Sequence, residues 1–288
     1  MKDLNYELKK MCQRNRDGSF ATQRDRERVL TLIADQLHSL GYRNLSAVSL
    51  KPKHVEALIE KWRSDDLSAG TVKNRMAVLR WWAEKVGKQN VIARDNSHYG
   101  IPDRTFVSSG SKAKFIDTDA LGKVKDVHVR MSLELQQAFG LRREEAIKFQ
   151  PRYADQGDYL ILKASWTKGG KAREIPVRTE VQRAVLDRAH RLVGNGSLIP
   201  SARNYRQQVR VYEKHTANAG LSRLHGLRHA YAQRRYEELT GWEAPAAGGP
   251  TAQTLTPQQR ATDREARLRI SAELGHERGQ VTAVYLSR

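Results

Sequence analysis

The sequence is nearly without cysteine. Cys12 is the single cysteine among 288 residues, so an intramolecular disulfide is impossible and a zinc site built from cysteines is excluded. Long apolar runs are missing too, since none approaches the roughly 20 residues that span a bilayer. The N-terminus MKDLNYELKK lacks the apolar segment of a secretory signal peptide. We therefore expect a cytoplasmic protein with no membrane partner.

Acidic residues are too few to balance the basic ones. Lys and Arg total 51 against 32 Asp and Glu, which gives a formal net charge of +19. Residues 1–105 hold 20 of the basic and 13 of the acidic residues, so the excess is spread over the whole chain. With 39% hydrophobic residues the chain is globular. Such a surplus favours a polyanionic partner, above all nucleic acid, over a charge that only aids solubility.

The first hundred residues read as helices. Apolar residues recur at helical spacing over residues 24–42, 50–66 and 67–88. Pro52 fits the first turn of the second helix, and Ser68 is the expected N-cap of the third. This third helix carries Lys73 and Arg80 away from its apolar stripe, as a DNA-facing surface requires, although an ordinary solvated face is the competing interpretation.

The remainder of the chain mixes helices with two short strands. Residues 117–150 predict two helices, a break at Gly140 and a third helix that begins near Arg142. The strand-like runs DYLILKASW and REIPV flank the turn TKGGKA. Further helices are expected over residues 180–192 and 204–218. The run GWEAPAAGGPTAQTLTPQQ, which starts at Gly241, is expected to be an exposed insertion.

These patterns predict a mainly α chain with a small β-sheet, divided into two domains. Residues 95–113 are rich in Gly, Ser, Asn and Pro and read as linker. The expected boundaries are a helical domain over 1–100, a linker over 101–113 and an α+β domain over 114–288.

One stretch, LSRLHGLRHAYAQRRYEE over residues 221–238, gathers positive charge. As a helix it stacks His225, Arg228 and His229 within one turn, where the backbone dipole is already positive. Such a group is expected to face an anion. Two histidines four positions apart can also hold zinc, but no glutamate follows His225 and no third ligand is evident. We expect no metal, and interpret His229 as a packed, hydrogen-bonded residue.

Four further candidates complete a constellation: Arg142 in FGLRREEAIKF, Lys168 in TKGGKA, His276 in LGHERG and Tyr285 in VTAVYL. In this order, with the histidine nine positions before the tyrosine, the chain resembles the tyrosine recombinase (phage integrase) family along its whole length. The resemblance implies a helical core-binding domain of SAM-like fold over 1–100 and a catalytic domain over 114–288. It also implies a site-specific recombinase that integrates or excises a mobile element through a covalent 3′-phosphotyrosyl intermediate.

The chemistry explains why such residues belong together. Attack on a phosphodiester builds negative charge on its non-bridging oxygens, which the guanidinium groups of Arg142 and Arg228 can hold bidentately. Two nearby cations also favour the phenolate of Tyr285 as nucleophile. The phosphotyrosyl link stores the bond energy, so we expect no cofactor. The resemblance makes Lys168 the general acid that protonates the leaving 5′-hydroxyl.

The resemblance also assigns roles to two histidines and a glutamate. His225 would act as base or as a phosphate hydrogen-bond donor, and His276 would donate to the phosphate in the transition state. The family pattern Gly-Leu-Arg followed by Glu selects Arg142 over Arg143. Glu145 either orients this arginine from behind or is an ordinary partner three residues away. His229 is expected to support the site as a packed residue and not to react itself.

Alternatives remain for the acid and the nucleophile. Lys171 competes with Lys168, and otherwise it is expected to contact the DNA backbone, as is Arg173. Tyr231 or Tyr236 could replace Tyr285 as the nucleophile, although the spacing from His276 argues against either.

Two features depart from the family pattern. The stretch between Arg228 and His276 is longer than usual, with the excess at residues 241–261. Only three residues follow Tyr285, so the segment with which many relatives dock on the adjacent protomer is expected to be missing or supplied elsewhere.

The resemblance implies double-stranded DNA as the partner and a homo-tetramer that assembles on it, with an accessory DNA-bending protein as a further partner. A bacterial, nucleoid-associated protein is the corresponding expectation. Two other functions compete: a non-catalytic DNA-binding regulator that keeps the scaffold, and a type IB topoisomerase.

Overall fold

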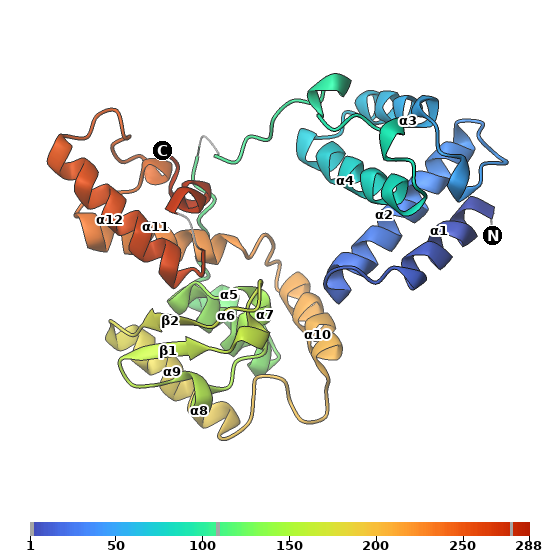
Figure 1. Cartoon of the computed structure of the whole chain (residues 1–288). Coiled ribbons are helices and arrows are strands. Elements are labelled where there is room, and N and C mark those ends of the chain that lie inside the picture. Colours follow the sequence, from blue (N-terminus) through green and yellow to red (C-terminus); the bar gives the residue numbers. More distant parts are fainter. Residues whose placement is uncertain (1–2, 108–109, 277–278) are drawn as a thin grey trace. The chain divides into compact units, whose positions relative to one another are not determined.

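The computed structural model describes residues 3–107, 110–276 and 279–288 of the chain (Figure 1). They are mostly helical, with one two-stranded antiparallel sheet, as the sequence predicts. The chain divides into two compact units, Met1–Thr105 and Phe106–Arg288, each with its own core. Within the described ranges, no helix is both long and apolar enough to cross a membrane.

Unit 1 (Met1–Thr105) consists of α-helices and short 3-10 turns. They are α1 (Asp3–Arg14), α2 (Phe20–Ser39), η1 (Ala47–Ser49), α3 (Pro52–Ser64), α4 (Ala69–Lys85), η2 (Gln89–Val91) and η3 (Ser97–Tyr99). The sequence predictions for α2, α3 and α4 are confirmed, and α3 begins at Pro52. Ser68 caps α4 by accepting a hydrogen bond from the Thr71 amide at 3.3 Å. Trp62 and Trp82 are fully buried in the common core.

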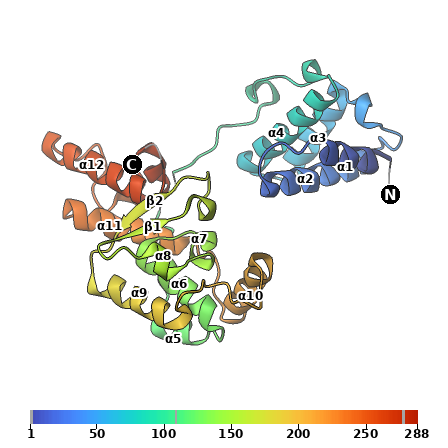
Figure 2. The same ribbon diagram turned by 60° about the horizontal axis from the view of Figure 1, so that its bottom comes forward.

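Unit 2 (Phe106–Arg288) alternates helices with the sheet. Its elements are α5 (Thr118–Gly122), α6 (Val127–Phe139), α7 (Arg143–Ile147), α8 (Pro151–Ala154), β1 (Tyr159–Leu162), η4 (Ala164–Trp166), β2 (Arg173–Pro176), α9 (Glu180–Val193), α10 (Tyr205–Asn218), α11 (Gly226–Thr240), η5 (Pro245–Ala247), α12 (Pro257–Glu273), η6 (Gly279–Thr282) and α13 (Ala283–Leu286). The strands pair with Leu160 opposite Ile175. In Figure 2, α11 lies beside α12 at one end of the unit, and α9 lies at the other.

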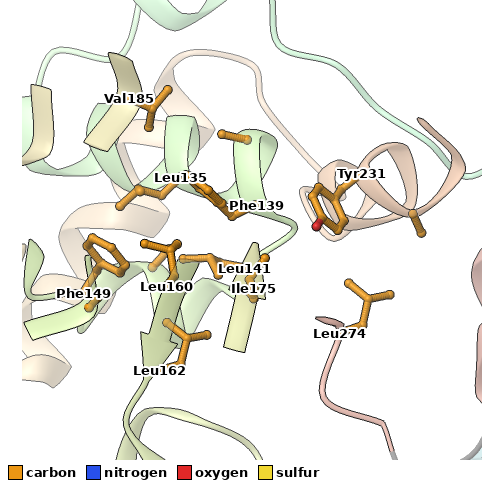
Figure 3. Close-up of a cluster of buried hydrophobic side chains, with 14 of the residues drawn as sticks. Leu135, Phe139, Leu141, Phe149, Leu160, Leu162, Ile175, Val185, Tyr231 and Leu274 are labelled. Atoms are coloured by element: carbon orange, nitrogen blue, oxygen red, sulfur yellow. The ribbon is translucent and has the colours of Figure 1, made fainter. Parts of the chain in front are cut away.

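The core of unit 2 joins segments that are far apart in sequence. Figure 3 shows Phe139 at the end of α6, Leu160 and Ile175 from the two strands, and Tyr231 of α11 gathered in one cluster. Alternation along the strands places Leu160 and Ile175 on the same buried face. Helix α11 also packs against α12 and α13, so the core fixes the helix that carries Arg228, the helix that carries Tyr285 and the helix that His276 follows.

Gly140 ends α6, as the sequence predicts, and adopts a left-handed conformation with φ of 62°. A Cβ at this position would lie 2.7 Å from Cδ1 of the Tyr231 ring. We expect Gly140→Ala to lower the free energy of unfolding by about 2–4 kcal/mol, because left-handed strain and overpacking add. Urea denaturation measures the change. Gly241→Ala is the matched control, since Gly241 follows α11 with a φ of 83° and a Cβ there meets nothing within 4 Å; equal losses in both variants would contradict the packing argument.

The prediction of a wholly exposed insertion after Gly241 is wrong in part. Ala244 and Leu255 are buried, and Pro257 begins α12, which Thr256 caps. The composition of this stretch does not predict these buried positions. A single Ala or Leu between polar residues is buried when it packs against a neighbouring helix, and that helix cannot be identified from the local sequence.

Candidate active site

The hydroxyl group of Tyr285 lies against polar side chains. Tyr285 belongs to α13 and is 5% exposed. Its Oη accepts a hydrogen bond from Nε of Arg228 at 3.2 Å and lies 3.3 Å from Nε2 of His276. The ring packs on His229, with centroids 4.7 Å apart, and the Tyr285 carbonyl accepts from Gln233 at 3.0 Å. The phenol is therefore held firmly, with its oxygen against a cation.

Arg228 is almost completely buried, at 1% exposure, in the first turns of α11. Its Nη1 donates to the Gly140 carbonyl at 2.6 Å, and its Nη2 donates to the carbonyl of Leu274. Burial is the main cause that lowers the pKa of Arg228, to about 10, so the side chain stays charged at neutral pH. A buried cation needs such acceptors because desolvation is costly. They also aim Nε at the tyrosine.

Arg142 is the N-cap residue of α7 and is bound to Glu145. Its backbone amide donates to Oε2 of Glu145 at 2.7 Å, and its Nη1 donates to Oε1 at 2.8 Å. The Arg142 side chain is 19% exposed, whereas Arg143 is half exposed and pairs with Glu213 at 2.9 Å. Arg142, not Arg143, thus faces the site. Glu145 is placed behind it, as an orienting residue would be.

The two arginines converge on the same histidines. Burial, followed by the positive charges of Arg228 and Arg142, lowers the pKa of both His225 and His276, in the second case to about 4. His225 is the N-cap residue of α11. Both imidazoles are consequently neutral at neutral pH, which relieves the repulsion expected from so many basic side chains. Each keeps one donor and one acceptor nitrogen.

His229 packs inside the site. Its ring contacts His225 and Tyr285, and burial lowers its pKa to about 4. Its position is that of a packed residue, whereas the expected hydrogen bond of its side chain is not seen among the described residues. Among the residues that the structure describes, no three His, Cys, Asp or Glu side chains are arranged to hold a metal ion, so the zinc alternative gains no third ligand.

Lys168 and Lys171 are the two candidates for the general acid. Both are exposed in the turn that joins β1 to β2. Lys168 has no hydrogen bond or ion pair within the described part of the chain, and the carbonyl of Lys171 accepts from Thr167 Oγ1 at 2.6 Å. No contact among the described residues joins the Lys168 ammonium group to Tyr285, and the choice between the two lysines stays a prediction.

The alternative nucleophiles have the opposite surroundings. The Tyr231 hydroxyl donates to Glu273 at 2.7 Å, and the Tyr236 hydroxyl donates to Asp263 at 2.6 Å. Burial and these carboxylates raise the pKa of both phenols, for Tyr236 to about 12. A phenolate beside a carboxylate is disfavoured, so Tyr285 is the better candidate.

Three residues expected to contact DNA are engaged within the chain. In unit 1, Lys73 pairs with Asp103 at 2.6 Å, and Arg80 donates to the Ala93 carbonyl at 3.0 Å. In unit 2, Arg173 is buried and bound to Glu145, so a role at the DNA surface does not fit its position. Helical spacing shows which face a residue occupies, but not which loop or carboxylate covers that face.

The sequence analysis did not predict a ridge of three basic residues on α10. Arg206, Arg210 and Lys214 recur every fourth residue and are exposed along one face of the helix. Their spacing was the available signal. Beside α10, a hollow of about 390 Å³ is lined by Arg143, Arg223 and other residues, and it reaches His225. The hollow is lined on the α10 side by Tyr212, Glu213, Thr216 and Ala217, so α10 itself, though none of the three ridge residues, borders it.

Two family models match the sequence. Residues 1–92 match the model described as "Phage integrase, N-terminal", and residues 100–234 match the model described as "Integrase". The second match includes Arg142, Lys168, His225 and Arg228, whereas His276 and Tyr285 follow it. No curated protein sequence matches the chain.

Solved structures with the same fold cover nearly the whole chain. A lambda integrase dimer bound to a COC′ core site has a TM-score of 0.62 at 16% identity, covering 99% of this chain and 77% of that one. XerH site-specific recombinase bound to palindromic difH, a post-cleavage complex, has a TM-score of 0.59 at 17% identity, covering 98% and 80%. The Tn1549 transposon integrase in complex with circular intermediate DNA has 0.57 at 13%, covering 99% and 95%. The shared fold is a SAM-like N-terminal domain followed by a catalytic domain.

Proposed function

Because the chain belongs to the tyrosine recombinase (phage integrase) family, we propose that it is a site-specific recombinase that cleaves and rejoins DNA through a 3′-phosphotyrosyl intermediate. The observation that carries this proposal is the surroundings of the Tyr285 hydroxyl. It accepts from Arg228 at 3.2 Å and lies 3.3 Å from His276. Integration or excision of a bacterial mobile element is the proposed biological role.

In the proposed reaction, Tyr285 Oη attacks the scissile phosphorus while the bond to the 5′ oxygen breaks. Arg142 and Arg228 bind the non-bridging oxygens, on which negative charge grows. Neutral His225 acts as the base that takes the Tyr285 proton or, where Tyr285 has already lost this proton to solvent, donates a hydrogen bond to the phosphate. Neutral His276 donates to the phosphate. Lys168, or Lys171 from the same turn, protonates the leaving 5′ oxygen; this role requires the turn to move toward the site when DNA binds. Reversal of these steps rejoins the strand.

The proposed substrate is double-stranded DNA, held by both units. Unit 1 would act as the core-binding domain and unit 2 as the catalytic domain, with the boundaries at 1–100, 101–113 and 114–288 kept as a prediction. Solved relatives include a lambda integrase dimer on a core site and a tetramer on a Holliday junction. We propose a homo-tetramer on DNA in the bacterial nucleoid, with an accessory bending protein as a further partner.

Capture of covalent protein–DNA complexes tests the proposal without knowledge of the target. Cells that express the chain are lysed under denaturing conditions, and the DNA attached to the Tyr285 peptide is sequenced. We expect one or a few discrete attachment sites. Absence of any adduct would favour the non-catalytic regulator. Scattered attachment together with relaxation of supercoiled plasmid would favour a type IB topoisomerase.

The α10 ridge supplies a prediction about DNA affinity. We expect Arg206→Gln, Arg210→Gln and Lys214→Gln each to make the negative slope of log Kobs against log salt shallower by about 0.9. A variant with one phosphate contact fewer releases fewer counterions when it binds DNA. Fluorescence anisotropy with a non-specific duplex over a salt series measures the slope. Arg191→Gln, at an exposed position on α9, is the control. An unchanged slope in all three ridge variants would remove α10 from the interface.

A further inference from the structure

A third guanidinium group lies behind the candidate active site. Arg173 comes from β2, and its side chain is 6% exposed. Its Nη1 donates to Oε1 of Glu145 and its Nη2 to Oε2, both at 2.7 Å, so the pair is bidentate. The remaining nitrogen, Nε, is buried and has no partner among the described residues. The proposed reaction gives Arg173 no task.

Glu145 connects Arg173 to Arg142. The same Oε1 accepts from Nη1 of both arginines, and the same Oε2 accepts from the Arg142 amide and from Arg173 Nη2. Four donors thus fill a carboxylate that is 0% exposed. Because Arg173 takes one donor position on each oxygen, Glu145 holds Arg142 through a single guanidinium nitrogen. The other terminal nitrogen of Arg142 is not bound by Glu145.

Arg173 also touches the turn that carries His276. A Cβ on Gly275 would lie 2.8 Å from Cδ and 2.9 Å from Nη1 of Arg173. The arginine therefore fills the space beneath the residue that precedes His276, and only glycine fits above it. The buried Arg173 side chain therefore contacts both Glu145, which binds Arg142, and Gly275, which precedes His276.

We propose that Arg173 is a positioning residue that keeps Glu145 ionised and bidentately occupied, so that Arg142 remains directed at the phosphate. The proposal rests on the proposed recombinase function. Without Arg173, a buried carboxylate has two outcomes. It takes a proton, which weakens its hold on Arg142, or it draws the whole guanidinium of Arg142 into a bidentate pair, away from the phosphate.

The charged and titratable groups around Glu145 determine the pH at which it takes a proton. They are Arg142 of α7, Arg173 of β2, Arg228 of α11, the neutral His225 before α11 and the neutral His276 after α12. Burial raises the pKa of Glu145, but the hydrogen bonds and charge of Arg173, followed by Arg228 and the Arg142 amide, lower it to about 2. The carboxylate is therefore ionised throughout the pH range in which the protein is assayed.

The test is the pH profile of cleavage on a suicide DNA substrate at the captured site, measured in single turnover. We expect Arg173→Met to slow cleavage by about tenfold to about a hundredfold at neutral pH, with DNA affinity unchanged. We also expect an additional loss of rate as the pH falls, since the pKa of Glu145 rises and the protonated form accumulates. Arg173→Lys, which keeps the charge, should restore most of the rate and remove the acid loss.

Glu145→Gln and the double variant separate positioning from mere packing. Neither variant can show the acid loss, because no carboxylate remains, and the double variant should be no slower than Glu145→Gln alone. A wild-type rate in Arg173→Met with a pH profile parallel to the wild type, or fully additive losses in the double variant, would overturn the proposal. If Arg173→Met does not fold, Arg173→Gln replaces it.

A direct titration makes the outcome independent of activity. Carbon-13 NMR of labelled glutamate carboxyl groups should show Glu145 titrating at higher pH in Arg173→Met than in the wild type. A wild type that forms no adduct would end the proposed function. An adduct-forming wild type whose Glu145 titrates as it does in the variant would end only the role of Arg173.

Discussion

Tyr285→Phe is expected to abolish the covalent protein–DNA adduct, with a loss of cleavage of at least about 10⁴-fold. The substitution removes one oxygen, the atom that Arg228 and His276 approach. The ring keeps its contact with His229, and the Tyr285 carbonyl keeps its bond from Gln233. DNA affinity and the unfolding midpoint should therefore stay close to those of the wild type. Denaturing gels of the protein on suicide substrates measure the adduct.

Two other tyrosines provide matched controls. Tyr231→Phe and Tyr236→Phe each remove one buried hydroxyl that donates to a carboxylate. We expect both variants to form the adduct while losing about 1 kcal/mol of stability, the net value of a typical hydrogen bond. An adduct that persists in Tyr285→Phe but disappears in either control would identify Tyr231 or Tyr236 as the nucleophile instead.

Arg228→Lys is expected to reduce cleavage by about 10³-fold or more while duplex affinity changes little. One ammonium group cannot reach the carbonyls of Gly140 and Leu274 together with Tyr285 Oη, which the guanidinium binds at once. Lysine is a sharper probe than alanine. Truncation to alanine would leave a cavity and unpaired buried carbonyls, at a cost of about 3–5 kcal/mol, and would confuse unfolding with lost chemistry.

The measurements for this variant are the cleavage rate, the Kd for the duplex and the urea midpoint. Arg143→Lys is the control, because Arg143 is half exposed and pairs with Glu213 outside the cluster; we expect near wild-type cleavage. Loss of DNA binding in parallel with cleavage in Arg228→Lys would mark Arg228 as a structural residue instead.

The local features of the fold were accessible from the sequence. Pro52 predicts the start of α3, Ser68 the start of α4 and Gly140 the end of α6. These predictions succeed because helix caps and breaks depend on a few adjacent residues. The spacing between His276 and Tyr285 pointed to one site, and the structure brings the two side chains together at 3.3 Å. Their catalytic roles stay a prediction that the experiments above address.

Contacts between distant segments were not accessible. Helical spacing places Lys73 and Arg80 on one face, but it does not show that each binds a loop of unit 1 that follows α4; their contact with DNA stays a prediction. Arg173 was expected at the surface, yet β2 carries it under α7, where Glu145 neutralises it. The sequence does not distinguish a basic residue that contacts DNA from one that is buried and paired with a carboxylate. The partner in the tertiary structure makes this distinction.

The order and spacing of basic, imidazole and phenol side chains determined the family, since motifs of neighbouring residues are written directly in the sequence. Tertiary structure decided which charges meet. Packing of α11 against α6, α12 and α13 buries Arg228 beside Tyr285, and pairing of β1 with β2 carries Arg173 to Glu145. Electrostatic interaction depends on separation and burial in space, and neither quantity can be read from positions along a chain.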